Sequence, residues 1–428
     1  MISLTNISTA YRQARNKPRH KVLRWMISLW LTGIIFLENL GEQISLTLLL
    51  VSFAWIIPWA LLTLGRHLIS AEVYKTRPAT LRAMVAFLAV AVLSCAYSLN
   101  ISISMMYVVI TCAGFILCGG LWHVIVGHET QVLSRFAVLS TAGLSLIFLS
   151  TYSGVGRFDS IRNPNSIGLI LFGIVAASLA IRAVLLRAVC LGACLYMLWS
   201  TQSRSAMIGT VLMLAVYLAL TWRTLPRAAK WLSIFASLGL VAVAIANSSF
   251  WAGDVNTFVT TALRLSDPDR GINSNFTSRT ELWRIALAGC KEHWLGGIGY
   301  RAHDSYPGLE MTAHNGYLAL WLETGVFGVM AMFLLFYSGV RELIAQSRRG
   351  LQPAKIGLSL IAGYLFICFF ERYLINFGTP TSILVLMFLL IPRPPIQGPY
   401  SPQNTFGFHA RGKLDAQSCY RPQHTNSL

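Results

Sequence analysis

His314 stands where a long polar segment of the chain meets a hydrophobic stretch, and Asn315 and Gly316 follow it directly. A neutral imidazole at a membrane surface can accept a proton from a hydroxyl group at neutral pH. The polar segment before it carries several arginines, and guanidinium groups stabilise an anionic leaving group. The sequence therefore predicts proton-transfer chemistry at a membrane surface, with His314 as the base.

Three further polar pieces fall at the ends of hydrophobic stretches and are expected on the same side of the membrane as His314. They run from Arg157 to Asn165, from Ser200 to Ala206 and from Ser278 to Trp283. A Glu-Thr-Gly sequence at residues 323–325 follows His314. These pieces are distant in the sequence, so only folding would bring them into one site.

Each of these residues also has a structural explanation. An arginine at the end of a membrane span commonly extends to lipid phosphate, and this explanation fits Arg157, Arg162 and Arg372. Asn163 and Asn165 flank Pro164, as in a turn that caps a helix. A histidine at the interface commonly serves as a hydrogen-bonded anchor. Arg204 is harder to explain in this way, because its turn is short, has small residues and contains no acidic residue.

The composition is that of an integral membrane protein. The 428 residues are 55% hydrophobic and 12% charged, whereas about a quarter of a soluble domain is charged. The expected fold is all-α, a polytopic bundle of about 12 spans with one long periplasmic loop that contains short helices. The first span follows a basic segment without a small-residue cleavage site and is expected to be retained. The expected spans are 25–37, 43–64, 79–97, 103–122, 136–152, 166–181, 186–199, 205–222, 231–247, 316–338, 356–370 and 377–391.

The net charge of +18 follows membrane topology and does not indicate nucleic acid as a partner. With both termini in the cytoplasm, most of the 34 Lys and Arg residues face inward, as the positive-inside rule requires. Six of the ten that remain outside fall in the single long loop, which suggests that an anionic molecule is handled there. The ten are Arg157, Arg162, Arg204, Arg264, Arg270, Arg279, Arg284, Lys291, Arg301 and Arg372.

The chain divides into five segments at the expected span boundaries. Residues 1–20 form a cytoplasmic lead, 21–247 hold spans one to nine, 248–313 form the periplasmic loop, 314–391 hold spans ten to twelve, and 392–428 form a disordered cytoplasmic tail. Within the loop, residues 281–287 predict an amphipathic helix that Trp294 to Tyr300 interrupts. The glycines there favour either a tight turn with positive φ or a flexible linker. Only Cys290 among eight cysteines is expected outside, and no spacing suggests a metal site.

The order of these motifs resembles the O-antigen ligase and O-antigen polymerase superfamily. The pattern comprises Asn-Pro-Asn and Ser-Arg-Ser-Ala at two span starts, Arg-x-x-x-Trp in one long loop, a Gly-x-Gly turn, then Ala-His-Asn-Gly-Tyr-Leu and Glu-Thr-Gly. It covers residues 150–330 closely and the rest of the chain only as span count and hydropathy. It is specific to the superfamily and poor at choosing among its members.

The resemblance implies an inverting, metal-independent glycosyltransferase of the bacterial inner membrane, with no cofactor. The donor would be a glycan on undecaprenyl diphosphate, the acceptor another glycan or lipid A-core, and the reaction would occur on the periplasmic face beside membrane lipids. Arg279 and Arg204 match arginines expected to bind the diphosphate, and His314 matches the expected catalytic base. Arg157 or Arg162 matches a third arginine more loosely, because the usual glycine after it is absent. We expect Asn315, Asn165 and Arg284 to contact substrate as well.

Two alternatives stay open at this stage. His293 and His303 lie in the same loop and compete with His314 as the base. A lipid-linked glycan flippase or other secondary transporter is the competing function, although such proteins bury charged groups near the middle of the bilayer. Only Glu323 and Glu371 are acidic candidates near spans, and both are expected close to the membrane interface and not at its middle.

Overall fold

The structure is a computed structural model of the whole chain, and it is described for residues 18–37, 78–125, 127–152, 157–158, 163–224, 227, 230, 276–309, 314–372 and 374–390. Within these residues every regular element is a helix and no strand occurs. The expected all-α fold is therefore confirmed.

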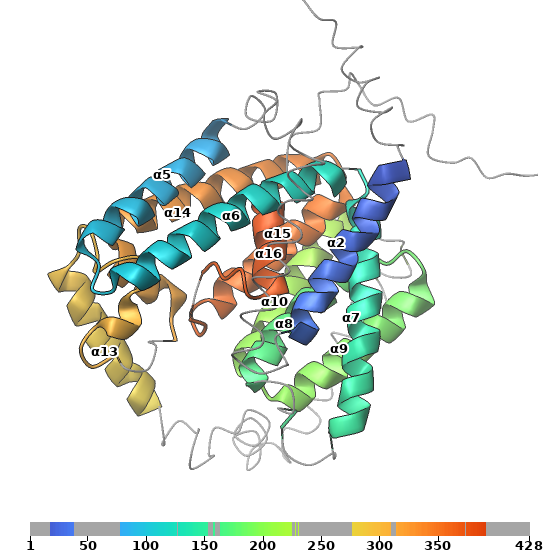
Figure 1. Cartoon of the computed structure of the whole chain (residues 1–428). Coiled ribbons are helices and arrows are strands. Elements are labelled where there is room, and N and C mark those ends of the chain that lie inside the picture. Colours follow the sequence, from blue (N-terminus) through green and yellow to red (C-terminus); the bar gives the residue numbers. More distant parts are fainter. Residues whose placement is uncertain are drawn as a thin grey trace, which may run out of the picture.

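Eleven α-helices and three short 3₁₀ helices make up the described residues (Figure 1). The 3₁₀ helices are η1 (Cys95–Tyr97), η2 (Trp222–Thr224) and η3 (His303–Ser305). The α-helices are α2 (Pro18–Leu37), α5 (Pro78–Ser94), α6 (Ile101–Ile125), α7 (Glu129–Thr151), α8 (Pro164–Ser178), α9 (Val184–Thr201), α10 (Arg204–Thr221), α13 (Phe276–Glu292), α14 (Gly316–Arg348), α15 (Gln352–Ile367) and α16 (Pro380–Leu389).

The described helices make this a multi-pass membrane protein. Six of them are long and apolar enough to cross a bilayer, and three shorter apolar helices, α8, α15 and α16, accompany them. The expected spans 43–64 and 231–247 lie outside the described residues. The count of 12 spans therefore stays a prediction.

Two short helices form the centre of the bundle. Every residue of α16 is buried, and so is α8 from Ile167 to Ser178. A helix that is apolar on all sides is either a lipid-facing span or part of a protein core, and the burial of these two helices places them in the core. In Figure 1, α5, α6 and the long α14 lie together along one side, while α2, α7 and α9 lie along another.

Small residues let the central helices approach closely. A Cβ on Gly209 of α10 would lie 3.1 Å from the carbonyl oxygen of Gly363 on α15, and the two helices run antiparallel across this contact. At the start of α8, a Cβ on Gly168 would lie 2.7 Å from the Cβ of Ser203. Since helices in lipid associate mainly through packing, such contacts fix which helix ends are neighbours.

Helix α14 is interrupted at Gly325. This residue has φ 61° and ψ −168°, so the expected span 316–338 is in fact a short helix, Gly316–Thr324, followed by a long one that continues to Arg348. The turn at residues 294–299 fills the interruption. Val326 N donates to the Trp294 carbonyl, Ile298 N donates to that of Leu322, and Gly299 N donates to that of Glu323. Backbone groups freed by the break therefore find partners within the protein.

The glycine-rich segment is a packed turn and not a flexible linker. Gly297 and Gly299 have φ of 76° and 112°. A Cβ on Gly297 would overlap the backbone of Glu323, and one on Gly299 would overlap Ser98. The amphipathic helix expected at 281–287 is also confirmed, as part of the longer α13.

Substituting Gly325 with alanine should therefore destabilise the protein. A Cβ there would overlap the Leu295 carbonyl and would impose a left-handed φ on a residue that disfavours it, at a cost of about 2 kcal/mol or more. Gly192→Ala in α9 is the matched control, because nothing lies within 4 Å of its Cβ position. We expect a lower melting temperature in detergent for Gly325→Ala alone. An unchanged value would mean that the break does not need glycine.

Candidate active site

Arg157 joins two of the predicted polar pieces. Its Nε donates to the Thr201 carbonyl at 3.0 Å, and a terminal guanidinium nitrogen lies 3.5 Å from Asn165 Oδ1. Phe158, which is buried, donates its amide to the Ser200 carbonyl at 2.9 Å. The expected partners Arg157 and Asn165 thus lie together, against the turn that leads to Arg204. Arg162 lies outside the described residues.

Two helices begin side by side at this place. Asn163 Oδ1 accepts the amide of Asn165 at 3.0 Å and so caps α8, with Pro164 in its first turn. Gln202, in the left-handed conformation with φ 53°, ends α9, and α10 begins at Arg204. The close contact of Gly168 with Ser203 keeps the two starts adjacent. Their amide groups and partial positive charge point the same way, which suits an anion.

His314 forms a strained turn at the start of α14. It is half-buried and has φ 44°, a value that few residues with a side chain adopt. Asn315 Oδ1 accepts the amides of Tyr317 and Leu318, each at 3.1 Å, and so caps the helix. Asn315 is itself buried. The Asn315 side chain therefore stabilises the turn that contains His314.

The turn of His314 is level with the start of α10. Gly316 N donates to the Cys368 carbonyl at 2.9 Å, directly after the last residue of α15. Arg204 lies five residues before Gly209, and Cys368 lies five residues after Gly363. Because the two helices are antiparallel, both steps run about 7.5 Å in the same direction from the contact between the two glycines. Arg204 and the His314 turn therefore lie at the same end of two helices that both pack against α15. Helices α8, α10 and α14 all begin at this end of the bundle. We call it the site end.

Helix α13 packs beside the start of α14. The buried Cys290 lies with its sulfur 3.6 Å from the Leu318 carbonyl oxygen, and burial raises the pKa of its thiol to about 12. Arg279 lies in the first turn of α13, and its side chain is outside the described part of the structure. Arg284 is exposed and forms an ion pair with Glu281 at 2.6 Å. The structure does not bring Arg284 to the other predicted residues.

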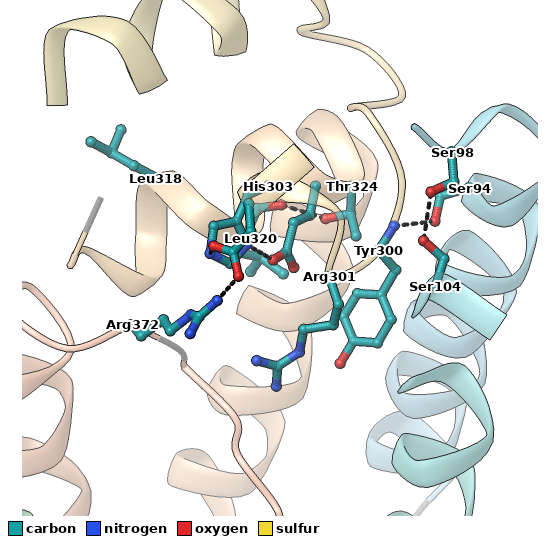
Figure 2. Close-up of polar contacts among 12 residues, drawn as sticks. Ser94, Ser98, Ser104, Tyr300, Arg301, His303, Leu318, Leu320, Thr324 and Arg372 are labelled. Carbon is teal, nitrogen blue, oxygen red and sulfur yellow. Dashed lines mark hydrogen bonds and ion pairs between the residues drawn. The ribbon is translucent and has the colours of Figure 1, made fainter. Parts of the chain in front are cut away.

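A group of charged residues around η3 and the short half of α14 was not among the residues predicted for the site (Figure 2). Buried His303 lies between Asp304 and buried Glu323, and Asp304 forms an ion pair with Arg372. Buried Arg301 donates to the Ile375 carbonyl. Two signals could have identified the group: Arg301 and Arg372 were expected outside against the usual charge distribution, and Glu323 belongs to the Glu-Thr-Gly motif.

The two competing histidines differ in their surroundings. The side chain of His303 is 1% exposed, and both of its ring nitrogens face carboxylates. His293 is 39% exposed at the end of α13, near Tyr306 and Glu292. Among the described residues no group of three His, Cys, Asp and Glu side chains is arranged to hold a metal. The expectation of chemistry without a metal stays a prediction.

Residues 188–333 match the model of the O-Antigen ligase family. The match begins within α9 and ends within the second half of α14, so it includes Arg204, Arg279 and His314. The chain therefore carries an O-Antigen ligase domain, and the resemblance seen in the sequence is confirmed. Arg157 and Asn165 lie outside the matched segment. No curated protein matches the chain.

The packing of α13 on α14 predicts that Cys290 is unreactive. With a pKa of about 12 and no exposed surface, its thiol should resist a water-soluble maleimide at pH 7.5 in the folded protein, because only the thiolate reacts. Leu295→Cys is the matched control, because Leu295 is 46% exposed in the adjacent turn. We expect labelling at position 295 and none at Cys290 until the protein is denatured. Rapid labelling of native Cys290 would mean that α13 does not dock as described.

Proposed function

We propose that this membrane protein, with its O-Antigen ligase domain, moves a glycan from undecaprenyl diphosphate to a sugar-chain or lipid A-core acceptor on the periplasmic face of the inner membrane. It would act as an O-antigen or exopolysaccharide polymerase, or as an O-antigen ligase. The observation that supports the proposal is that three chain segments lie at one end of the bundle: Arg157 and Arg204 beside two adjacent helix starts, and the His314 turn level with them.

The cations would stabilise the departing diphosphate. As the bond between the anomeric carbon and the phosphate oxygen breaks, negative charge grows on that oxygen. Guanidinium groups form short, charge-assisted hydrogen bonds to phosphate, and they act more strongly where water is scarce. Arg204 and Arg157, beside the starts of α10 and α8, are suitably placed, and Arg279 would complete the site from α13. This arrangement would not need a metal ion.

His314 would act as the general base. The acceptor hydroxyl oxygen would attack the anomeric carbon on the side opposite the diphosphate, while its proton passes to the neutral imidazole. One such displacement inverts the configuration at that carbon. The bond from sugar to phosphate breaks as the new glycosidic bond forms, so the products are the extended glycan and undecaprenyl diphosphate.

The proposed orientation follows from the charges at the opposite end of the bundle. Basic residues gather where helices meet at that end, between α8 and α9, after α10, and between α14 and α15. The positive-inside rule then makes that end cytoplasmic and the site end periplasmic. We propose 12 spans in all, with both termini in the cytoplasm. The basic residues concerned are Arg182, Arg187, Arg223, Arg341, Arg348 and Arg349.

One observation favours the alternative of a lipid-linked glycan flippase or other secondary transporter. Many transporters have interrupted helices whose freed backbone groups bind the transported ion or substrate, and α14 is interrupted at Gly325. Here, however, the freed carbonyls of Leu322 and Glu323 accept hydrogen bonds from the turn at residues 294–299. The interruption is occupied by the protein's own backbone, which favours the enzyme.

Purified protein supplied with an undecaprenyl-diphosphate-linked glycan and a glycan acceptor in detergent separates the two functions. A transferase forms a new glycosidic bond, which mass spectrometry of the product detects. A flippase forms none, because it only moves the lipid-linked glycan from one side of a membrane to the other. Failure to form product from any lipid-linked donor offered, with protein that is folded by size-exclusion chromatography, would contradict the proposed activity.

Substitutions of the proposed base and cations should abolish that transfer. We expect His314→Ala to lower the rate by about 10²–10⁴-fold, as for loss of a general base. Arg204→Ala and Arg279→Ala should each lower it by about 10²-fold or more, through loss of a charge-assisted contact to the leaving group. His293→Ala is the matched control and should retain activity. Full activity of His314→Ala, at equal protein abundance in the membrane, would reject this site.

A further inference from the structure

The turn that carries His314 belongs to a closed ring of contacts. Gly316 N donates to the Cys368 carbonyl, and Cys368 begins the connection between α15 and α16. Four residues later in that connection, Arg372 forms an ion pair with Asp304. Beside Asp304, His303 pairs with Glu323, which lies on the same short half of α14 as Gly316. The ring of contacts therefore starts at Gly316 and ends at Glu323, near the two ends of the short half of α14.

The conformation of His314 needs such support. With φ 44°, its backbone lies in the left-handed region, which costs about 1 kcal/mol or more for a residue with a Cβ. Such a conformation persists only where neighbours hold it. Because φ sets the direction of the Cβ, relaxation of the turn would also turn the imidazole away from its position. The contacts that hold the turn therefore also determine the direction of the His314 side chain.

The last turn of α15 and the connection that follows it supply the direct support. Besides the hydrogen bond from Gly316, Tyr317 OH donates to the Leu365 carbonyl at 2.8 Å, and its ring contacts that of Phe369 at 4.6 Å between centroids. The connection has no regular secondary structure over much of its length. Side chains from the segment around η3 hold it at two places, through the Arg372–Asp304 ion pair and the hydrogen bond from Arg301 to the Ile375 carbonyl.

His303 ties that segment to α14. Its Nδ1 faces Glu323 and its Nε2 lies 3.0 Å from Asp304 Oδ1, so one buried ring spans two carboxylates (Figure 2). A buried carboxylate needs a polar partner, because its isolation would cost several kcal/mol. Glu323 thereby fixes His303, and His303 orients Asp304 toward Arg372. Figure 2 shows Arg372 approaching this group from the opposite side to Ser94 and Ser98.

The pocket beside this group is too small to hold a sugar. It has a volume of about 20 Å³, enough for about one water molecule. Its lining includes Arg301, Glu323 and Gly316. Since a sugar residue cannot enter, direct binding of substrate there is not the role that the geometry supports. The group is better suited to act on its neighbours through contacts within the protein.

We infer that Asp304 and Arg372 are positioning residues for His314: their ion pair holds the connection between α15 and α16 against the His314 turn, and so aims the imidazole at the acceptor hydroxyl. This inference rests on the proposed function, in which His314 is the base. His303 and Glu323 form the buried anchor of the pair. The ion pair itself is partly exposed, with Arg372 at 38% and Asp304 at 43%, so it can be altered without opening the core.

The kinetic test compares Asp304→Asn and Arg372→Gln with the unsubstituted protein. Because a displacement of about 1 Å can lower catalysis by about 10²-fold, we expect kcat to fall by at least about tenfold while KM for donor and acceptor changes less than about twofold. The double variant Asp304→Asn with Arg372→Gln should lower kcat no further than either single variant, because each removes the same ion pair. Glu292→Gln is the matched control, a carboxylate of the same segment that accepts a hydrogen bond from Tyr306 outside the ring.

A second measurement does not depend on activity. Hydrogen–deuterium exchange of residues 314–320 reports the amide of Gly316, which is bonded to the Cys368 carbonyl. We expect exchange there to accelerate by about fivefold or more in Asp304→Asn and Arg372→Gln, and to stay unchanged in Glu292→Gln. Unchanged exchange in both ion-pair variants would overturn the inference, whether or not the protein transfers glycans.

The remaining outcomes are also decisive. A rise in KM with kcat unchanged would overturn the inference in favour of direct substrate binding by Arg372. Losses of kcat in the two single variants that add in the double variant would equally count against an ion pair. Absence of transfer by the unsubstituted protein, together with faster exchange in the variants, would reject the proposed function while supporting the structural link between the ion pair and the His314 turn.

Discussion

The interruption of α14 at Gly325 is the constraint on which the site end depends. A helix broken at this depth frees backbone amides and carbonyls, and each would cost several kcal/mol if it faced hydrocarbon. The turn at residues 294–299 supplies their partners. That repair also determines where Arg301 and His303 lie, because they follow the turn directly. It likewise separates the short half of α14, which carries His314 at its start, from the long half that continues as a span.

The second constraint is the close approach of glycine-bearing helices. Contacts at Gly168 and Gly209 align the starts of α8 and α10 with the end of α15, and the Cys368 carbonyl extends the alignment to α14. Positive helix ends normally repel one another when they converge. Here the positive field of the helix starts can be offset by the carbonyls that accept hydrogen bonds from Arg157 and Gly316. A bound anion would offset it in the same way. The electrostatic character of the site end is therefore a consequence of helix packing.

Much of this organisation was predictable from the sequence. Hydropathy predicted an all-helical membrane protein, and the motif order predicted the family domain. Asn163 beside Pro164 predicted the cap of α8 correctly. The break at Gly325 was not predictable, because hydropathy continues through it and only the packing against Trp294 to Gly299 reveals it. The His303–Glu323 pair was missed for a similar reason: the sequence placed the two residues in different segments, and neither position shows burial by itself.

The cations expected outside the membrane do not share one role, although the sequence treats them alike. Arg284 is paired with Glu281 at the surface, and Arg372 is paired with Asp304. Arg301 is buried, bonded to a carbonyl, and stacked 5.3 Å over the ring of Tyr107. These three satisfy charges or carbonyls of the protein itself. Arg157 also donates to a carbonyl of the protein, that of Thr201, but it and Arg204 stand beside helix starts, where backbone amides add to their field. A departure from the positive-inside rule thus indicates that a cation has a specific local partner, and only at the helix starts do backbone amides add to the positive charge of the side chain.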